Sequence, residues 1–162
     1  MSGGPPPPPT EHGVRLSWAD NAMHWAIPAR RYIEANNFLD LQLGFLALHL
    51  CIVRANLLVN GCSTKRCGMT IAPDLVAAGD CPLDPNELSR VSQRVERIRD
   101  QIMHLPGGLE PGRTVNLDAR RGKKTIRIVG KGGKAQMADT EAVALLDALE
   151  PWIRRQRERL IA

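Results

Sequence analysis

Aromatic residues are scarce in this chain, at 4% of 162 residues, so aliphatic side chains must fill most of any core. The N-terminal segment MSGGPPPPPTEHG lacks the basic start and the apolar run of a secretory signal. The chain lacks an uninterrupted apolar run long enough for a membrane span. Its longest apolar stretch, residues 36–61, contains polar side chains whose burial in a bilayer is unfavourable: Asp40, Gln42, His49, Arg54 and Asn56. We therefore expect a cytoplasmic protein with reduced thiols and no membrane segment.

Hydrophobic residues make up 43% of the chain, which excludes a wholly disordered protein. A length of 162 residues suits one domain with a sizeable core. We expect a disordered Pro/Gly-rich tail over residues 1–13 and a single domain over residues 14–162.

Positive charge is concentrated in the second half of the chain. The formal net charge is +5, but residues 113–162 hold twelve Lys and Arg against six Asp and Glu. Residues 1–112 hold ten Lys and Arg against eleven Asp and Glu. The basic half can contact nucleic acid or another polyanion, although an ordinary solvated surface explains the same counts equally well.

The first part of the domain is predicted to be a helical core over residues 17–105. Ser17 is a plausible N-cap of the first helix, and Pro28 should interrupt that helix or start a second one. The apolar stretch predicts a central buried helix over 38–60, ended by Asn-Gly. Residues 61–86 look like a long loop with a short helical turn around 74–78.

The next helix has the clearest pattern in the chain. Its apolar residues are spaced three and four apart, which places them on one face: Leu88, Val91, Val95, Ile98, Ile102 and Leu105. Asp84 or Asn86 could cap its start, and Pro106 with two glycines should end it.

The hydrophobic period then changes from helical to alternating. TVNLD and KTIRI alternate, and KAQMA could be a short returning strand, so we predict a small basic β-hairpin or meander over 113–138. A last helix should run over 140–160, capped by Asp139 or Thr140 and kinked or divided at Pro151. The fold class is therefore mainly α, with a small C-terminal β-hairpin followed by a last helix.

The cysteines and the glycine-rich stretch of this sequence lack the residue spacing of the common metal-binding and phosphate-binding motifs. The four cysteines, Cys51, Cys62, Cys67 and Cys81, do not have the paired spacing of a zinc site, so buried or loop thiols are the better interpretation. The stretch GKGGK lacks the spacing of a phosphate-binding Walker loop and fits a β-turn. We predict neither a metal nor a cofactor.

One short stretch, RDQIMH at residues 99–104, contains chemistry-bearing residues at the end of a helix. His104 can hold or release a proton near neutral pH, and Arg99 offers a planar fork of donors suited to a phosphate. Asp100 could orient either group. Arg99 and His104 are about 140° apart on an ideal helix, so they do not share a face. Such a trio is also common at ordinary helix ends.

The motif and the order of elements resemble the HEPN family (higher eukaryotes and prokaryotes nucleotide-binding). Its hallmark is an Arg, a polar residue, a three-residue spacer and a His, here Arg99, Asp100, QIM and His104. In that family the motif follows a long apolar helix and lies late in a small helical bundle. Pro106 directly after the motif departs from a helix that continues.

The resemblance implies a metal-independent endoribonuclease that works as a homodimer, with two copies of the motif facing one cleft. His104 would help to deprotonate the RNA 2′-OH or to protonate the leaving oxygen. Arg99 would stabilise charge on the phosphate, and Asp100 would orient its neighbours. Basic residues of the hairpin would hold the RNA backbone: Lys123, Lys124, Arg127, Lys131 and Lys134. A role as a toxin with an antitoxin protein, or in phage defence, would fit such an enzyme.

Two other interpretations stay open at this point. The chain could be a catalytically silent HEPN-like module for dimerisation or binding. It could also be a nucleic-acid-binding protein in which the basic hairpin makes the contacts and RDQIMH is purely structural.

Overall fold

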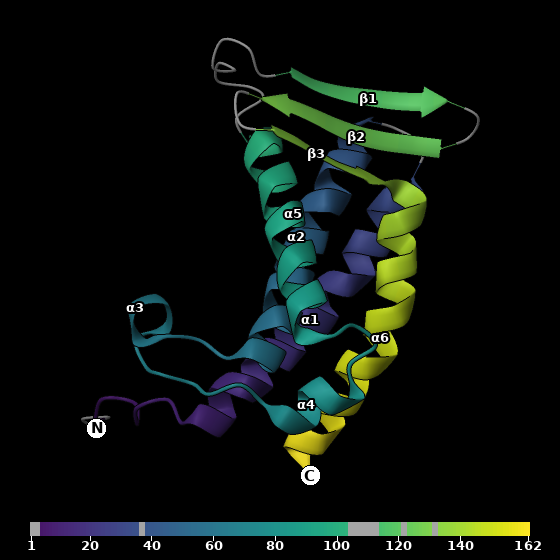
Figure 1. Cartoon of the computed structure of the whole chain (residues 1–162). Coiled ribbons are helices and arrows are strands. Elements are labelled where there is room, and N and C mark those ends of the chain that lie inside the picture. The colour runs from purple at the N-terminus through teal and green to yellow at the C-terminus, as the bar shows by residue number, and fades with distance from the viewer. Residues whose placement is uncertain (1–3, 36–37, 104–113, 121–122, 131–132) are drawn as a thin grey trace.

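Four long helices form the body of the computed structural model, and a small sheet lies across one end of them (Figure 1). The structure describes residues 4–35, 38–103, 114–120, 123–130 and 133–162. The elements in chain order are α1 (Glu11–Glu34), α2 (Phe38–Asn60), α3 (Thr64–Cys67), α4 (Leu75–Asp80), α5 (Pro85–Met103), β1 (Thr114–Arg120), β2 (Lys123–Gly130), β3 (Gly133–Ala138) and α6 (Asp139–Ile161). The prediction of a mainly α fold with a β element before the last helix is confirmed.

Helix α2 is the centre of the bundle, because it packs against both α1 and α5. Its segment Asp40–Asn60 is long and apolar enough to cross a membrane, yet 56% of its most apolar stretch is buried inside the protein. Residues such as Leu41, Phe45, Leu48 and Ile52 are fully buried there. The predicted central buried helix is therefore present between the predicted bounds.

Small side chains let α1 lie close to α2. Ala19, Ala22, Ala26 and Ala29 are all fully buried. On α2, a Cβ added to Gly44 would come within 2.8 Å of the backbone nitrogen of Ile33. The close approach of these two helices thus depends on the absence of a side chain at Gly44, and the buried alanines let α1 pack closely in the bundle.

The start of α1 differs from the sequence prediction. The helix begins at Glu11, inside the predicted tail, because the Thr10 side chain caps it by accepting a hydrogen bond from the Gly13 amide at 3.0 Å. Ser17 lies within the helix, so its predicted role as N-cap is wrong.

Pro28 lies inside α1, which continues to Glu34, so the prediction that this proline interrupts the helix or starts a second one is wrong. Pro151 lies inside α6 without dividing it, which leaves a kink as the only one of its two predicted effects still open. Buried neighbours such as Ala26, Ala29 and Trp152 hold both helices in the bundle. The packing of these faces offsets the hydrogen bond that each proline removes. The last helix also starts differently, since Ala138 occupies its N-cap position without a side-chain bond.

The predicted hairpin is a three-stranded antiparallel meander with strand order β1-β2-β3. β3 contacts α5, and both β2 and β3 contact α6, so the sheet covers the end of the bundle where α5 finishes and α6 starts (Figure 1). Ala135 and Met137 of β3 are buried, whereas Gln136 between them is exposed. This alternation explains why KAQMA forms a strand with one face on the helices.

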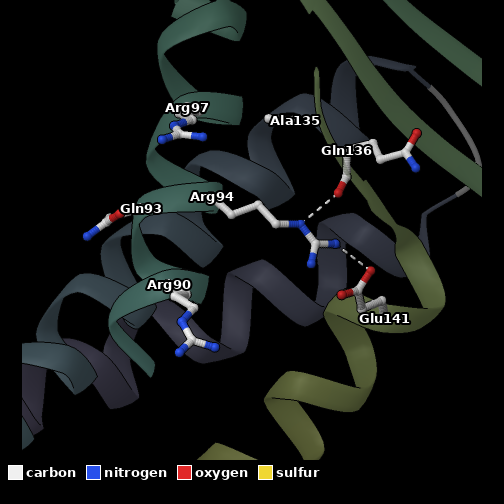
Figure 2. A pocket seen from close by; sticks show the side chains of 7 residues that line it. All are labelled: Arg90, Gln93, Arg94, Arg97, Ala135, Gln136 and Glu141. Carbon is white, nitrogen blue, oxygen red and sulfur yellow. Dashed lines mark hydrogen bonds and ion pairs between the residues drawn. The ribbon is translucent and has the colours of Figure 1, made fainter. Parts of the chain in front are cut away.

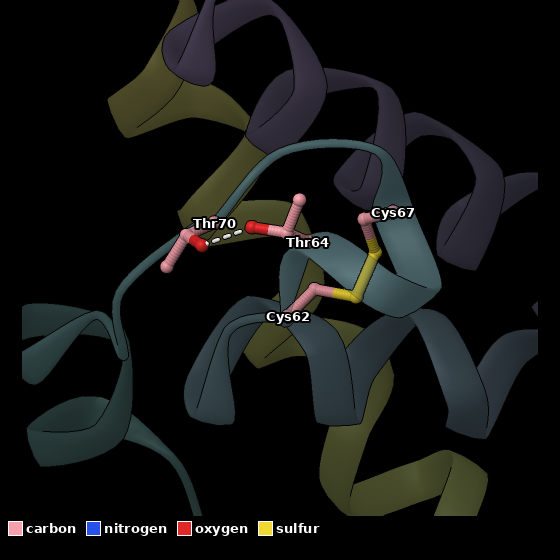
Figure 3. The surroundings of a disulfide bond; sticks show 4 residues. All are labelled: Cys62, Thr64, Cys67 and Thr70. Carbon is pink, nitrogen blue, oxygen red and sulfur yellow. Dashed lines mark hydrogen bonds between the residues drawn. A yellow bond between two sulfur atoms is a disulfide. The ribbon is translucent and has the colours of Figure 1, made fainter.

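A disulfide between Cys62 and Cys67 closes the turn that contains α3 (Figure 3). The hydroxyls of Thr64 and Thr70 share a hydrogen bond beside it. The prediction that all cysteines are reduced thiols is therefore wrong for this pair. Cys51 is a buried thiol, as predicted, and burial raises its pKa to about 12.

The loop before α5 contains the second short helix, close to the predicted turn. α4 begins after Asp74, whose carboxylate accepts hydrogen bonds from the amides of Val76 and Ala77. The indole of the fully buried Trp152 donates to the Ala77 carbonyl at 3.0 Å, which ties α4 to α6. The Asp84 carboxylate caps α5 by accepting a hydrogen bond from the Glu87 amide at 2.9 Å. Of the two predicted caps, Asp84 and Asn86, the first is therefore confirmed.

Candidate functional site

Arg99 and Asp100 lie near the C-terminal end of α5, the end that meets the sheet (Figure 1). The preceding apolar residues Leu88, Val95 and Ile98 are fully buried and fix this helix against α2. Arg99 is therefore held on a rigid element rather than on a loop, and its side chain is only 33% exposed.

The guanidinium of Arg99 is surrounded by acidic groups on the same helix. Its Nη2 lies 2.9 Å from Oδ1 of Asp100 and 3.7 Å from Oε1 of Glu96. Its Nε is buried and has no hydrogen-bond partner among the described residues. The carboxylates orient the guanidinium, and its exposed part remains available to an anion.

The other predicted site residues are described in part. His104 lies outside the described residues, so the structure presents the motif only through Arg99 and Asp100. Lys123, Lys124 and Arg127 lie on β2 and Lys134 lies on β3, whereas Lys131 lies outside the described residues. The structure thus brings the basic strands and the Arg99 end of α5 to the same end of the bundle.

His49 is the site residue that sequence reasoning missed. In the sequence it is only a polar residue within the apolar stretch 36–61, and in the structure it is buried, at 8% exposed. However, α2 packs against α5, and this places His49 where the charges of Glu96, Arg99 and Asp100 act on it. Its Nε2 is buried without a hydrogen-bond partner in the described part of the chain. Only the packing of two helices, which the sequence pattern does not give, could have revealed this neighbour.

Burial, and secondly the positive charge of Arg99, lower the pKa of His49 below its ordinary value of 6.5. Glu96 and Asp100 act in the opposite direction. A lowered pKa keeps the imidazole neutral at neutral pH, so it adds no second positive charge beside Arg99. His49 is therefore a buried, neutral neighbour of the charged end of α5.

This arrangement gives a signed prediction for the titration of His49. Replacing Arg99 by alanine should raise the His49 pKa, because a repelling charge is removed, and Glu96→Gln should lower it further. An NMR titration of the imidazole resonances measures both shifts. Equal pKa values in the parent and both variants would contradict the placement of His49 beside these charges.

The same shift has a consequence for stability. The unfolded chain binds the His49 proton more readily than the folded one, so the free energy of unfolding should fall as pH drops below about 6.5. This loss is complete once the pH lies below the folded pKa. The His49→Gln variant should show a smaller fall over this range.

Among the described residues, no three of His, Cys, Asp or Glu lie together in a way that could hold a metal ion. Comparisons with family models, curated proteins and solved structures found no match to this chain. The candidate site is therefore argued from its own residues.

Proposed function

We propose that this protein is a metal-independent endoribonuclease of the HEPN type that cleaves RNA at a site built from Arg99, Asp100 and His104. The observation that carries the proposal is the partly exposed guanidinium of Arg99, ion-paired to Asp100 at 2.9 Å, just before His104 in the chain. A permanent positive charge for the phosphate and a histidine that can transfer protons are the two groups that cleavage of a phosphodiester by the 2′-OH uses.

The proposed reaction breaks the bond between phosphorus and the 5′-oxygen of the following nucleotide. A histidine removes the proton of the 2′-OH, and the 2′-oxygen attacks the phosphorus. The leaving 5′-oxygen takes up a proton, so the products are a 2′,3′-cyclic phosphate and a 5′-OH end. Arg99 stabilises the negative charge that builds on the phosphate oxygens in the transition state, and Asp100 orients Arg99.

We propose that the active form is a homodimer. Arg99 and His104 are about 140° apart on an ideal helix, so one helix does not present both to the same phosphate. Two copies of the helix end, meeting across a two-fold axis, can combine Arg99 of one protomer with His104 of the other. A toxin or phage-defence enzyme with an antitoxin partner fits this activity.

The cytoplasm is the compartment in which we propose that the enzyme meets RNA. The disulfide between Cys62 and Cys67 counts against this compartment, because cytosolic thiols are normally kept reduced. The disulfide lies beside α3, in the loop between α2 and α5, and belongs to no part of the proposed reaction.

Blocking the nucleophile tests the proposed reaction. Purified protein in EDTA should cut a labelled single-stranded RNA but leave the same sequence intact when every 2′-OH is methylated. Cutting of the methylated oligonucleotide would contradict attack by the 2′-oxygen. Binding without cutting of several RNAs would instead support the nucleic-acid-binding alternative, which is favoured by the basic residues on β2 and β3.

A further inference from the structure

A cavity of about 500 Å³ lies between α5, β3 and the first turn of α6, and three of its seven lining residues are arginines (Figure 2). Arg90, Gln93, Arg94 and Arg97 follow one another at spacings of three, one and three residues, so they share one face of α5. Gln136 of β3 and Glu141 of α6 form the other wall. We call this cavity the arginine groove.

The arginine groove has an excess of positive charge. Only Glu141 opposes the three guanidinium groups within its lining. Neighbouring arginines at these spacings repel one another, which costs a few tenths of a kcal/mol per pair, about 0.2–0.5. Glu141 offsets part of this repulsion through its ion pair with Arg94, and an anion bound at Arg90 and Arg97 would offset the rest.

The three arginines of the groove differ in whether their guanidinium groups are already bonded within the protein. Arg94 is engaged, since its Nη2 lies 2.6 Å from Glu141 and its Nε donates to the Gln136 carbonyl at 2.7 Å (Figure 2). It thus joins α5 to the sheet and α6. Arg90 and Arg97 are exposed, and within the described ranges no carboxylate forms an ion pair with either. These two guanidinium groups remain available for a ligand.

The groove is separate from the candidate active site. Arg99 follows Arg97 by two residues, which is about 200° around the helix. Arg99 accordingly lies near His49 on the side of α2, whereas Arg97 faces the cavity beside β3.

The position of the groove indicates an extended ligand. Arg90 and Arg97 are about 10 Å apart along the helix axis, which is longer than one phosphate group. In the sheet, Gln136 of the groove pairs with Arg127 of β2, the strand that also carries Lys123 and Lys124. A basic strand thus runs directly beside the wall of the groove.

We propose that the arginine groove binds the phosphate backbone of single-stranded RNA, with Arg90 and Arg97 each contacting a phosphate. The choice of RNA rests on the proposed function, but the site itself depends on charge and geometry alone. The backbone would then continue from the groove toward the basic strands, and Arg94 would keep the two walls together.

A binding measurement with a 2′-O-methyl RNA tests this site independently of cleavage, because that probe has no nucleophile. By fluorescence anisotropy, the double variant Arg90→Gln/Arg97→Gln should bind about tenfold or more weakly at low salt. The slope of log K against log salt should fall in magnitude by about 1.4, since two phosphate contacts to a single strand are lost at about 0.7 each. The control Arg66→Gln/Arg154→Gln removes the same net charge from exposed positions outside the groove.

Equal weakening by both double variants would overturn the proposal, because net charge alone would then explain binding. Unchanged RNA affinity in the groove variant, with loss of inorganic phosphate binding, would assign the groove to a small anion. Competition by polyglutamate as effective as that by RNA would assign it to an acidic protein partner. If the groove variant binds this probe more weakly than the control variant but the parent does not cut RNA, the groove stands and the proposed ribonuclease activity fails.

Discussion

Replacing Arg99 by alanine is expected to slow RNA cleavage by about 100- to 1,000-fold, the effect of removing one preorganised donor to a developing negative charge. The side chain is ion-paired at 2.9 Å to Asp100 and is held on the packed helix α5, so its placement needs no reorganisation during the reaction. Single-turnover cleavage of a labelled RNA measures the chemical step. Binding of RNA should change much less than the rate.

The control for this variant is Arg155→Ala. Arg155 also forms an ion pair with a carboxylate, that of Asp80 at the end of α4. Figure 1 shows α4 and the C-terminal end of α6 at the end of the bundle far from the sheet. Loss of Arg155 should leave the cleavage rate unchanged. Arg99→Lys keeps the charge without the planar fork and should give an intermediate rate. A parental rate in Arg99→Ala would remove this residue from the mechanism.

Gly61→Ala is expected to lower the free energy of unfolding by about 3 kcal/mol, from a left-handed backbone and a steric clash together. Gly61 has φ of +71°, directly after α2. A Cβ there would lie 2.1 Å from the carbonyl oxygen of Ile71. That oxygen accepts the hydrogen bond of the Cys62 amide at 2.9 Å, so the loop could not move without losing the bridge between Cys62 and Ile71.

Gly68→Ala separates the two causes. Gly68 has φ of +75° but no atom within 4 Å of an added Cβ, so only the backbone cost of about 1–2 kcal/mol applies. Urea unfolding followed by circular dichroism compares the two variants. Equal losses of stability would show that the contact between Gly61 and the loop is not close in solution.

The elements with strong local signals were predictable from the sequence. α2 has the predicted bounds because both the apolar run that forms the helix and the Asn-Gly pair that ends it can be recognised in the sequence alone. α5 follows its apolar stripe, and Asp84 caps it as one of two alternatives. The third strand could be predicted only as one possibility, because KAQMA is short. Its alternation of buried and exposed residues becomes clear only when the helices are seen to cover one face of the sheet.

Features that depend on contacts between distant segments were not predictable. The placement of His49 beside Arg99 requires the packing of α2 against α5. The arginine groove needs β3 and α6 to form its second wall, although the spacing of Arg90, Arg94 and Arg97 already placed them on one face. The pairing of Cys62 with Cys67 depends on how the loop folds back around α3. Thr10 was missed as a cap because Pro-rich residues precede it.

Cleavage of RNA by the parent protein and by His104→Ala, prepared identically and incubated in EDTA, tests the central claim most directly. The account predicts products with 2′,3′-cyclic phosphate ends from the parent and none from the variant. Cleavage by both proteins at the same rate, or by neither across several RNA sequences, would contradict the assignment of Arg99, Asp100 and His104 as an active site.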